Sequence, residues 1–200
     1  MTLFQLLMLG ASAFFAFKIY EHIQTLQDLE QNASDNQENE PRTAQAFSPF
    51  SPEALVQKAD SAYEEKDFEK AVALLTEANA KDSNNPDIIF KLGYMLQQIG
   101  NEEEAIKQYK EALELDNENE YIHNSLASIY RKNGEFVSAK MHLSASLEIN
   151  DENPITYYNY GNLLVDMQKK DEASAMYKKA VELNSDFSEA KEELQKLQEN

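Results

Sequence analysis

The 200-residue sequence contains no cysteine and no tryptophan, and it has only five glycines and five prolines. Without cysteine the chain can form no disulfide, no thiolate metal site, no cysteine nucleophile and no lipid-modified N-terminal cysteine. An all-β fold needs turn residues at short spacing, and glycine and proline are too scarce here to supply them. The sequence is rich in Ala, Glu, Lys, Leu and Gln, which favour helix. It therefore predicts an all-α protein.

Basic residues are also scarce, because 18 Lys and Arg stand against 36 Asp and Glu, for a net charge of -18. Such a surface repels phosphate backbones, so we expect no nucleic-acid partner. An acidic body instead favours basic protein partners.

Long apolar runs are absent except for one, Leu3 to Tyr20. Its 18 residues lie close to the lower limit of about 17 for a membrane-spanning helix. Lys18 can extend to the bilayer surface and Tyr20 can lie at the interface. We therefore expect residues 1–30 to form a transmembrane anchor helix with a juxtamembrane extension, membrane-bound through residues 3–20. Residues 31–51 are polar and predict a flexible linker.

The orientation and fate of this segment remain open between two alternatives. Lys18 is the single basic flank of the apolar run, and the positive-inside bias then places the C-terminal domain of a single-pass protein in the cytoplasm. In the alternative, Ala11-Ser12-Ala13 is a signal-peptide cleavage site, and the released protein is periplasmic.

From Pro52 the chain repeats every 34 residues without a gap, in units 52–85, 86–119, 120–153 and 154–187. Asn or Ser precedes each unit, and Pro follows it in three of the four, which is typical of a helix start. Gly100 and Gly134 mark the end of a first helix in their units. Each unit therefore predicts a helix–turn–helix, and residues 188–200 predict one amphipathic capping helix.

Small residues recur where paired helices must approach closely. A bulky residue follows the small residue of the second helix by four positions. The first-helix small residues are Ala59, Gly93, Ala127 and Gly161; those of the second helix are Ala71, Ala105, Ala139 and Ala173; the bulky ones are Leu75, Tyr109, Leu143 and Tyr177. We expect the bulky side chains to fill the space between helices.

This pattern resembles the tetratricopeptide repeat, and the second unit matches best through Leu92-Gly93, Gly100, Ala105, Tyr109 and Ala112. The resemblance implies a right-handed α-solenoid of four units plus the capping helix, preceded by the single apolar N-terminal helix. Lys66 and Gln168 replace the turn glycine in units one and four.

The resemblance also implies a concave surface lined by the first helices, where an extended peptide is held by stacking and hydrogen bonds. Carried over position by position, it assigns peptide binding to residues of units two to four. These are Phe90, Tyr94, Gln97, Tyr121, Asn124, Arg131, Lys132, Ile155, Tyr158, Asn159 and Asn162. We expect Phe90, Tyr94, Tyr121 and Tyr158 to face solvent until a partner covers them.

No catalytic or metal-binding pattern accompanies the repeats. His22, His123 and His142 lack metal-ligand spacing, and there is no phosphate-binding glycine loop or nucleophile elbow. We expect no cofactor, no metal, no small-molecule substrate and no enzymatic activity. The layout favours a membrane-tethered scaffold that binds a protein or peptide partner in envelope-associated complex assembly. The alternative is a soluble periplasmic assembly or maturation factor.

Overall fold

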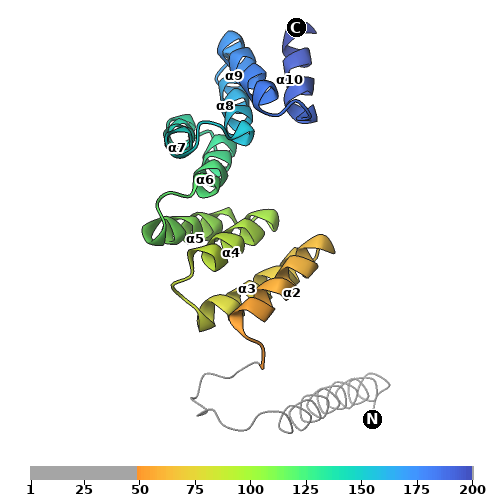
Figure 1. Cartoon of the computed structure of the whole chain (residues 1–200). Helices are drawn as coiled ribbons and strands as arrows, with labels where there is room; N and C mark the ends of the chain where they lie inside the picture. The colour runs from red at the N-terminus through yellow and green to blue at the C-terminus, as the bar shows by residue number, and fades with distance from the viewer. Residues whose placement is uncertain (1–48, 200) are drawn as a thin grey trace, which may run out of the picture. The chain divides into compact units, whose positions relative to one another are not determined.

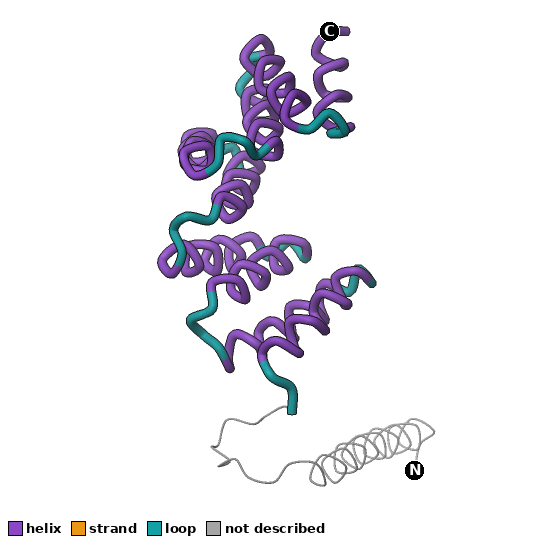
Figure 2. Tube along the Cα trace, in the orientation of Figure 1, coloured by secondary structure: helices purple, strands orange, loops and turns teal. Residues whose placement is uncertain are grey.

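The structure is a computed structural model that describes residues 49–199, and every regular element in this range is an α-helix (Figures 1 and 2). The predicted all-α fold is thus confirmed for the described part of the chain. The helices are α2 (Pro52–Glu64), α3 (Phe68–Lys81), α4 (Pro86–Gln98), α5 (Glu102–Leu115), α6 (Glu120–Lys132), α7 (Phe136–Ile149), α8 (Pro154–Asp166), α9 (Lys170–Leu183) and α10 (Ser188–Glu199).

The first helix of each pair is capped as the sequence predicts. The side chains of Ser51, Asn85, Asn119 and Asn153 each accept a hydrogen bond from a backbone N–H in the first turn. Proline occupies the first helical position of α2, α4 and α8, where its missing N–H is not needed. The four helix pairs therefore begin 34 residues apart.

A residue in the left-handed backbone conformation separates the two helices of each pair. Gly100 and Gly134 have φ of 79° and 76°, and Lys66 and Gln168 occupy the same register with φ of 61° and 62°. Units one and four thus keep the left-handed turn although they have no glycine at this position. At these two positions a side chain is held in a region that costs about 1–2 kcal/mol.

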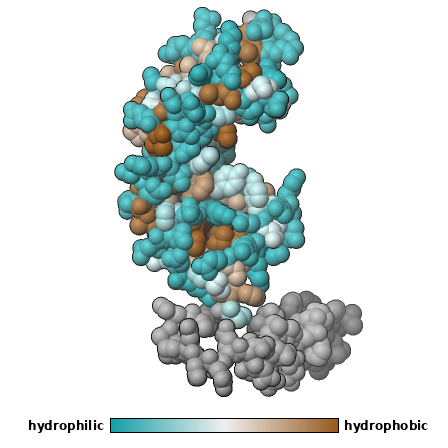
Figure 3. Space-filling view, viewed as in Figure 1, coloured by the Kyte–Doolittle hydropathy of each residue, from teal (hydrophilic) through white to brown (hydrophobic). Residues whose placement is uncertain are grey.

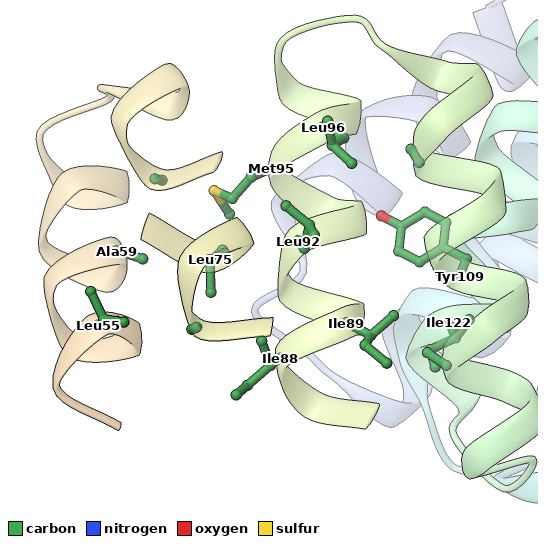
Figure 4. Packing of buried hydrophobic residues seen from close by; sticks show 14 of the residues in the cluster. Leu55, Ala59, Leu75, Ile88, Ile89, Leu92, Met95, Leu96, Tyr109 and Ile122 are labelled. Carbon is green, nitrogen blue, oxygen red and sulfur yellow. The ribbon is translucent and has the colours of Figure 1, made fainter. Parts of the chain in front are cut away.

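The core of each pair is built from the recurring small and bulky residues. Tyr109 and Tyr177 are fully buried, and each lies against the glycine of its own first helix, Gly93 or Gly161. Units one and three place a buried leucine where these units have tyrosine, and alanine where they have glycine. A larger side chain on the second helix is therefore matched by a smaller residue on the first helix of the same pair. Figure 4 shows Tyr109 reaching from α5 toward α4, with Ile89 and Ile122 beside it.

Helix α10 covers the end of the array. Ala190 is fully buried, and Leu194 and Leu197 pack on a cluster that includes Leu164 and Tyr177. In Figure 1, α10 lies beside α9. Helix α10 thus lies where the sequence predicts a capping helix.

Among the described residues, no helix is both long enough and apolar enough to cross a bilayer. The proposed anchor helix within residues 1–30 and most of the proposed linker lie outside the described residues. Figure 3 shows that the visible face of the described part is mainly hydrophilic, with apolar residues in separate patches.

Candidate partner-binding surface

The eleven residues assigned to partner binding lie on α4, α6 and α8. We call the exposed side of α2, α4, α6 and α8 the first-helix surface. Nine of the eleven side chains pack against or bond to other residues of the array, as described below. The other two, Tyr121 and Ile155, are exposed.

Phe90 and Tyr94 of α4 are half-buried. The Phe90 ring centroid lies 5.9 Å from that of Tyr109, and the Tyr94 centroid lies 6.0 Å from that of Tyr63. A hydrogen bond with Tyr63 and, to a smaller extent, burial raise the pKa of Tyr94 to about 12. Both side chains therefore contribute to packing between helices.

Tyr158 of α8 is also half-buried. Its ring centroid lies 5.0 Å from that of Phe187 and 5.9 Å from that of Tyr177. It thus joins α8 to α9 and to the segment that leads into α10.

Gln97 and Asn162 serve the two buried tyrosines. The Tyr109 hydroxyl donates to Gln97 Oε1 at 2.8 Å, and the Tyr177 hydroxyl donates to Asn162 Oδ1 at 2.7 Å. Burial raises the pKa of both tyrosines, so these hydroxyls remain protonated donors. Each amide satisfies a polar group that would otherwise be costly to bury.

Asn124 lies at the centre of a buried polar network between units three and four. Its Nδ2 lies 2.8 Å from Ser146 Oγ, 2.8 Å from Thr156 Oγ1 and 3.0 Å from the Glu120 carbonyl oxygen. Its Oδ1 accepts from Asn159 Nδ2 at 3.0 Å. The two asparagines therefore hold α6, α7 and α8 together.

The two basic residues among the eleven, Arg131 and Lys132, each form an ion pair within the array. Arg131 Nη1 lies 2.6 Å from Asp166 Oδ2 on the next unit. Lys132 forms an ion pair with Glu102 of the preceding unit. Both pairs are partly exposed, and such pairs contribute at most about 1 kcal/mol each.

Tyr121 and Ile155 differ from the other aromatic and aliphatic residues of the set because they are exposed to solvent. Tyr121 is 52% exposed and Ile155 is 45% exposed. They are the second residues of α6 and α8, so they occupy the same place in consecutive units. The two preceding units carry acidic residues there, Glu53 and Asp87. Units three and four thus carry an aromatic and an aliphatic side chain where units one and two carry carboxylates.

The expectation that four aromatics face solvent is therefore correct for Tyr121 and wrong for Phe90, Tyr94 and Tyr158. The three rings are half-buried because other rings of the array cover them. The same spacing that places a residue on the first-helix surface also brings it within reach of the neighbouring helices.

The sequence also failed to reveal a histidine pair. His123 of α6 and His142 of α7 are 19 residues apart, yet their Nδ1 atoms lie 3.0 Å from each other. The His142 ring stacks on that of Tyr130, with centroids 5.5 Å apart and planes tilted by 7°. Antiparallel pairing of α6 and α7 brings the two histidines together, and no local spacing rule detects this.

A second feature missed from the sequence is a pair of exposed apolar side chains on α7. Val137 is 87% exposed and Met141 is 60% exposed. At the position of Val137 the other units carry Glu69, Glu103 and Asp171.

Described by its geometry, this chain is a helical-hairpin repeat protein. Comparison with known families agrees: two family profiles, both described as tetratricopeptide repeat, match residues 62–129 and 155–187 and together cover just over half of the chain. The chain therefore carries tetratricopeptide repeats and belongs to that family.

Solved structures show the same fold. A thermophilic repeat protein of Thermus thermophilus, TTC0263, has a TM-score of 0.68 and 20% identity over 76% of this chain and 84% of its own. YrrB, described as a repeat protein with an unusual peptide-binding site, has a TM-score of 0.59 and 18% identity over 70% of this chain and 72% of its own.

One curated relative, a protein O-mannosyl-transferase of Caenorhabditis elegans, is 29% identical over 79 residues, which is 40% of this chain. The match spans only 11% of that protein, so its activity is not carried over to this chain.

Proposed function

We propose that this chain is a scaffold that binds a segment of a protein partner across the N-terminal turns of α6 and α8. Tyr121 and Ile155 are the anchors. The observation that carries this proposal is their exposure at equivalent positions of consecutive units. Apolar side chains grouped on a polar surface are typical of interaction sites.

The surroundings of the two anchors suit a peptide. The Asn124–Asn159 hydrogen bond lies between α6 and α8 and holds the two helices in a fixed relation. A rigid surface loses little entropy when a partner binds. The net charge of -18 favours a partner segment with basic residues beside its apolar ones. The peptide-binding site ascribed to YrrB, which shares the fold, supports a binding role rather than a catalytic one.

Affinity capture from native membranes tests this proposal. The full chain is used as bait, unaltered or with Tyr121→Ala and Ile155→Ala combined. We expect the double variant to lose about 1–3 kcal/mol of binding per anchor and to retain the bound partner poorly. Its helicity should be unchanged, because both side chains are exposed.

A matched control removes two exposed apolar side chains from second helices. Leu115 and Val137 are 45% and 87% exposed on α5 and α7. The variant Leu115→Ala with Val137→Ala should capture the partner as well as the unaltered chain. If this control loses the partner while the Tyr121 and Ile155 variant keeps it, the proposed site is wrong.

We further propose that residues 3–20 tether the chain to a membrane, with the repeats in the cytoplasm, and that the scaffold serves envelope-associated complex assembly. The apolar run and its single basic flank, Lys18, support this proposal. The alternative is a periplasmic factor released after Ala13. N-terminal sequencing of the mature protein distinguishes the two, since cleavage would leave Phe14 as the first residue.

The orientation has its own test. Protease added to spheroplasts should leave a cytoplasmic repeat domain intact, and detergent should then make it sensitive. Rapid loss of the repeats before detergent is added would place them outside the inner membrane.

A further inference from the structure

Helix α7 has an outer face on which exposed apolar residues and small residues lie together. Val137 and Met141 are exposed there, one turn apart. Ser144 and Ala145 continue the same face by one more turn and are partly exposed. Figure 1 shows α7 at one edge of the array. The face is therefore open to another molecule, and its small residues allow a second helix to approach closely.

Two residues of opposite charge, Lys140 and Glu148, complete this face. Both are exposed, and neither forms an ion pair with another residue of the range 49–199. Lys140 lies four residues before Ser144, and Glu148 lies four residues after it. The corresponding face of α3 instead carries two acidic residues, Glu69 and Glu77. The face of α7 thus holds one positive and one negative charge, placed symmetrically about Ser144.

A face with this symmetry is complementary to itself. In an isologous interface, residue i of one copy contacts residue j of the other, and j contacts i. When two α7 helices pack antiparallel about a two-fold axis at Ser144, Lys140 of each copy lies opposite Glu148 of the other. Met141 of each copy then lies against Ser144 and Ala145 of the other. This charge complementarity identifies a second copy of the chain as the molecule that covers the face.

We propose that the chain forms a two-fold symmetric dimer through antiparallel packing of α7 on α7. The contact is one helix face, which is smaller than the roughly 1,200–2,000 Å² that stable interfaces bury in total. The dimer is therefore weak, with a dissociation constant between about 1 μM and about 1 mM.

The charge of the whole chain acts against this dimer. Each copy carries a net charge of -18, so two copies repel each other at long range. Salt screens that repulsion over about 8 Å at physiological ionic strength. The charges on the contact face itself cancel, because Lys140 balances Glu148. Association should therefore be weaker at low salt than at physiological salt.

The dimer contact is separate from the proposed partner site. Tyr121 and Ile155 lie on α6 and α8, and each copy carries both. Partner capture therefore does not need the dimer. A crosslink from position 137 should join two copies of the chain and should not reach the partner.

Disulfide trapping of the full chain in intact cells tests the proposal. The unaltered chain contains no cysteine, so one introduced cysteine can link two copies only through the same position. Ser144→Cys lies at the proposed two-fold axis, and a mild oxidant should convert this variant to a covalent dimer. Thr76→Cys is the matched control, because Thr76 is exposed at the same place in α3, and it should remain monomeric. Equal yields of dimer from the two variants would indicate random collision and overturn the proposal.

Charge reversal identifies the interface. In the Ser144→Cys chain, Lys140→Glu or Glu148→Lys places like charges opposite each other at both ends of the contact. Dimer formation should then be slower by about 10-fold or more. Co-expression of these two single variants should restore it, because each then meets opposite charges on the other. Glu114→Lys makes the same change in charge at the same place in α5 and should have no effect.

Sedimentation equilibrium of the purified full chain in a mild detergent gives a second reading without any cysteine. The unaltered chain should dimerise reversibly, and either single charge variant should be monomeric at the same concentrations. Far-ultraviolet circular dichroism should show unchanged helicity, because both substituted side chains are exposed. If the unaltered chain stays monomeric up to about 1 mM, or if both charge variants dimerise as it does, α7 is not a dimer interface.

Discussion

Single residues set how closely the two helices of a unit approach each other. A Cβ added at Gly161 would lie 2.6 Å from Tyr177 Cδ1, and one added at Gly93 would lie 2.9 Å from Tyr109 Cδ1. Neither distance is tolerable for carbon atoms, and both rings are buried with little room to move. These two glycines are therefore fixed by the tyrosines opposite them.

The variant Gly161→Ala should destabilise the chain despite the higher helix propensity of alanine. Propensity favours alanine by about 1 kcal/mol, whereas overpacking a core costs about 1–3 kcal/mol. We expect a net loss because the Tyr177 ring is 1% exposed and hydrogen-bonded. Chemical denaturation measures the change in unfolding free energy.

Unit three supplies the control, since it pairs Ala127 with Leu143. Combining Gly161→Ala with Tyr177→Leu reproduces that pair, so the double variant should lose less stability than the sum of the two single variants. Strict additivity would show that the helices do not approach as closely as described.

Residue conformation also limits stability at Lys66 and Gln168. Their φ angles of 61° and 62° match those of the turn glycines in the other units. Lys66→Gly should relieve left-handed strain of about 1–2 kcal/mol, offset in part by the greater entropy of glycine in the unfolded chain. We expect a higher melting temperature for Lys66→Gly and a lower one for Gly100→Ala. The same sign for both would contradict this interpretation.

At the scale of helices, the junction between units three and four is polar where the preceding junctions are apolar. Asn124, Ser146 and Thr156 stand where other units have residues such as Val56, Ala112 and Ile122. Removing one member leaves buried partners unsatisfied, whereas replacing all of them with apolar groups can be neutral.

Asn124→Val alone should therefore lower the unfolding free energy by about 1–3 kcal/mol. The triple variant Asn124→Val, Ser146→Ala and Thr156→Ile should recover most of that loss. Equilibrium unfolding in urea measures both. If the triple variant is less stable than the single one, the polar network is worth more than the apolar contact it replaces.

Helix α10 is an end cap, because it covers Leu164 and Tyr177 of the last pair. A chain that ends at Phe187 should have a lower melting temperature and bind more of a hydrophobic dye. Leu194→Gln with Leu197→Gln should produce a milder form of the same defect. Unchanged dye binding in both would show that α10 covers no apolar core.

For the molecule as a whole, the repeat period predicted the helix pairs, because caps, prolines and small residues all act within one unit. The surface could not be predicted in the same way. Whether Phe90 or Tyr158 is open depends on Tyr109 and Phe187, residues 19 and 29 positions away. The contact of His123 with His142 is equally a product of helix pairing.

Tyr121 and Ile155 were identified in the sequence by the same position rule that failed for three other aromatics. Their exposure comes from their place at the start of α6 and α8. A position within a repeat thus predicts on which surface a side chain lies, and its neighbours in space decide whether it remains available.

Site-directed photo-crosslinking in intact cells tests the central claim, that a protein partner binds at these two residues. A photoreactive phenylalanine analogue is placed at position 121 or 155 and, as controls, at 115 or 137. We predict that positions 121 and 155 crosslink to the same protein and that the controls do not. Crosslinks to that protein from 115 and 137, with none from 121 and 155, would contradict the account.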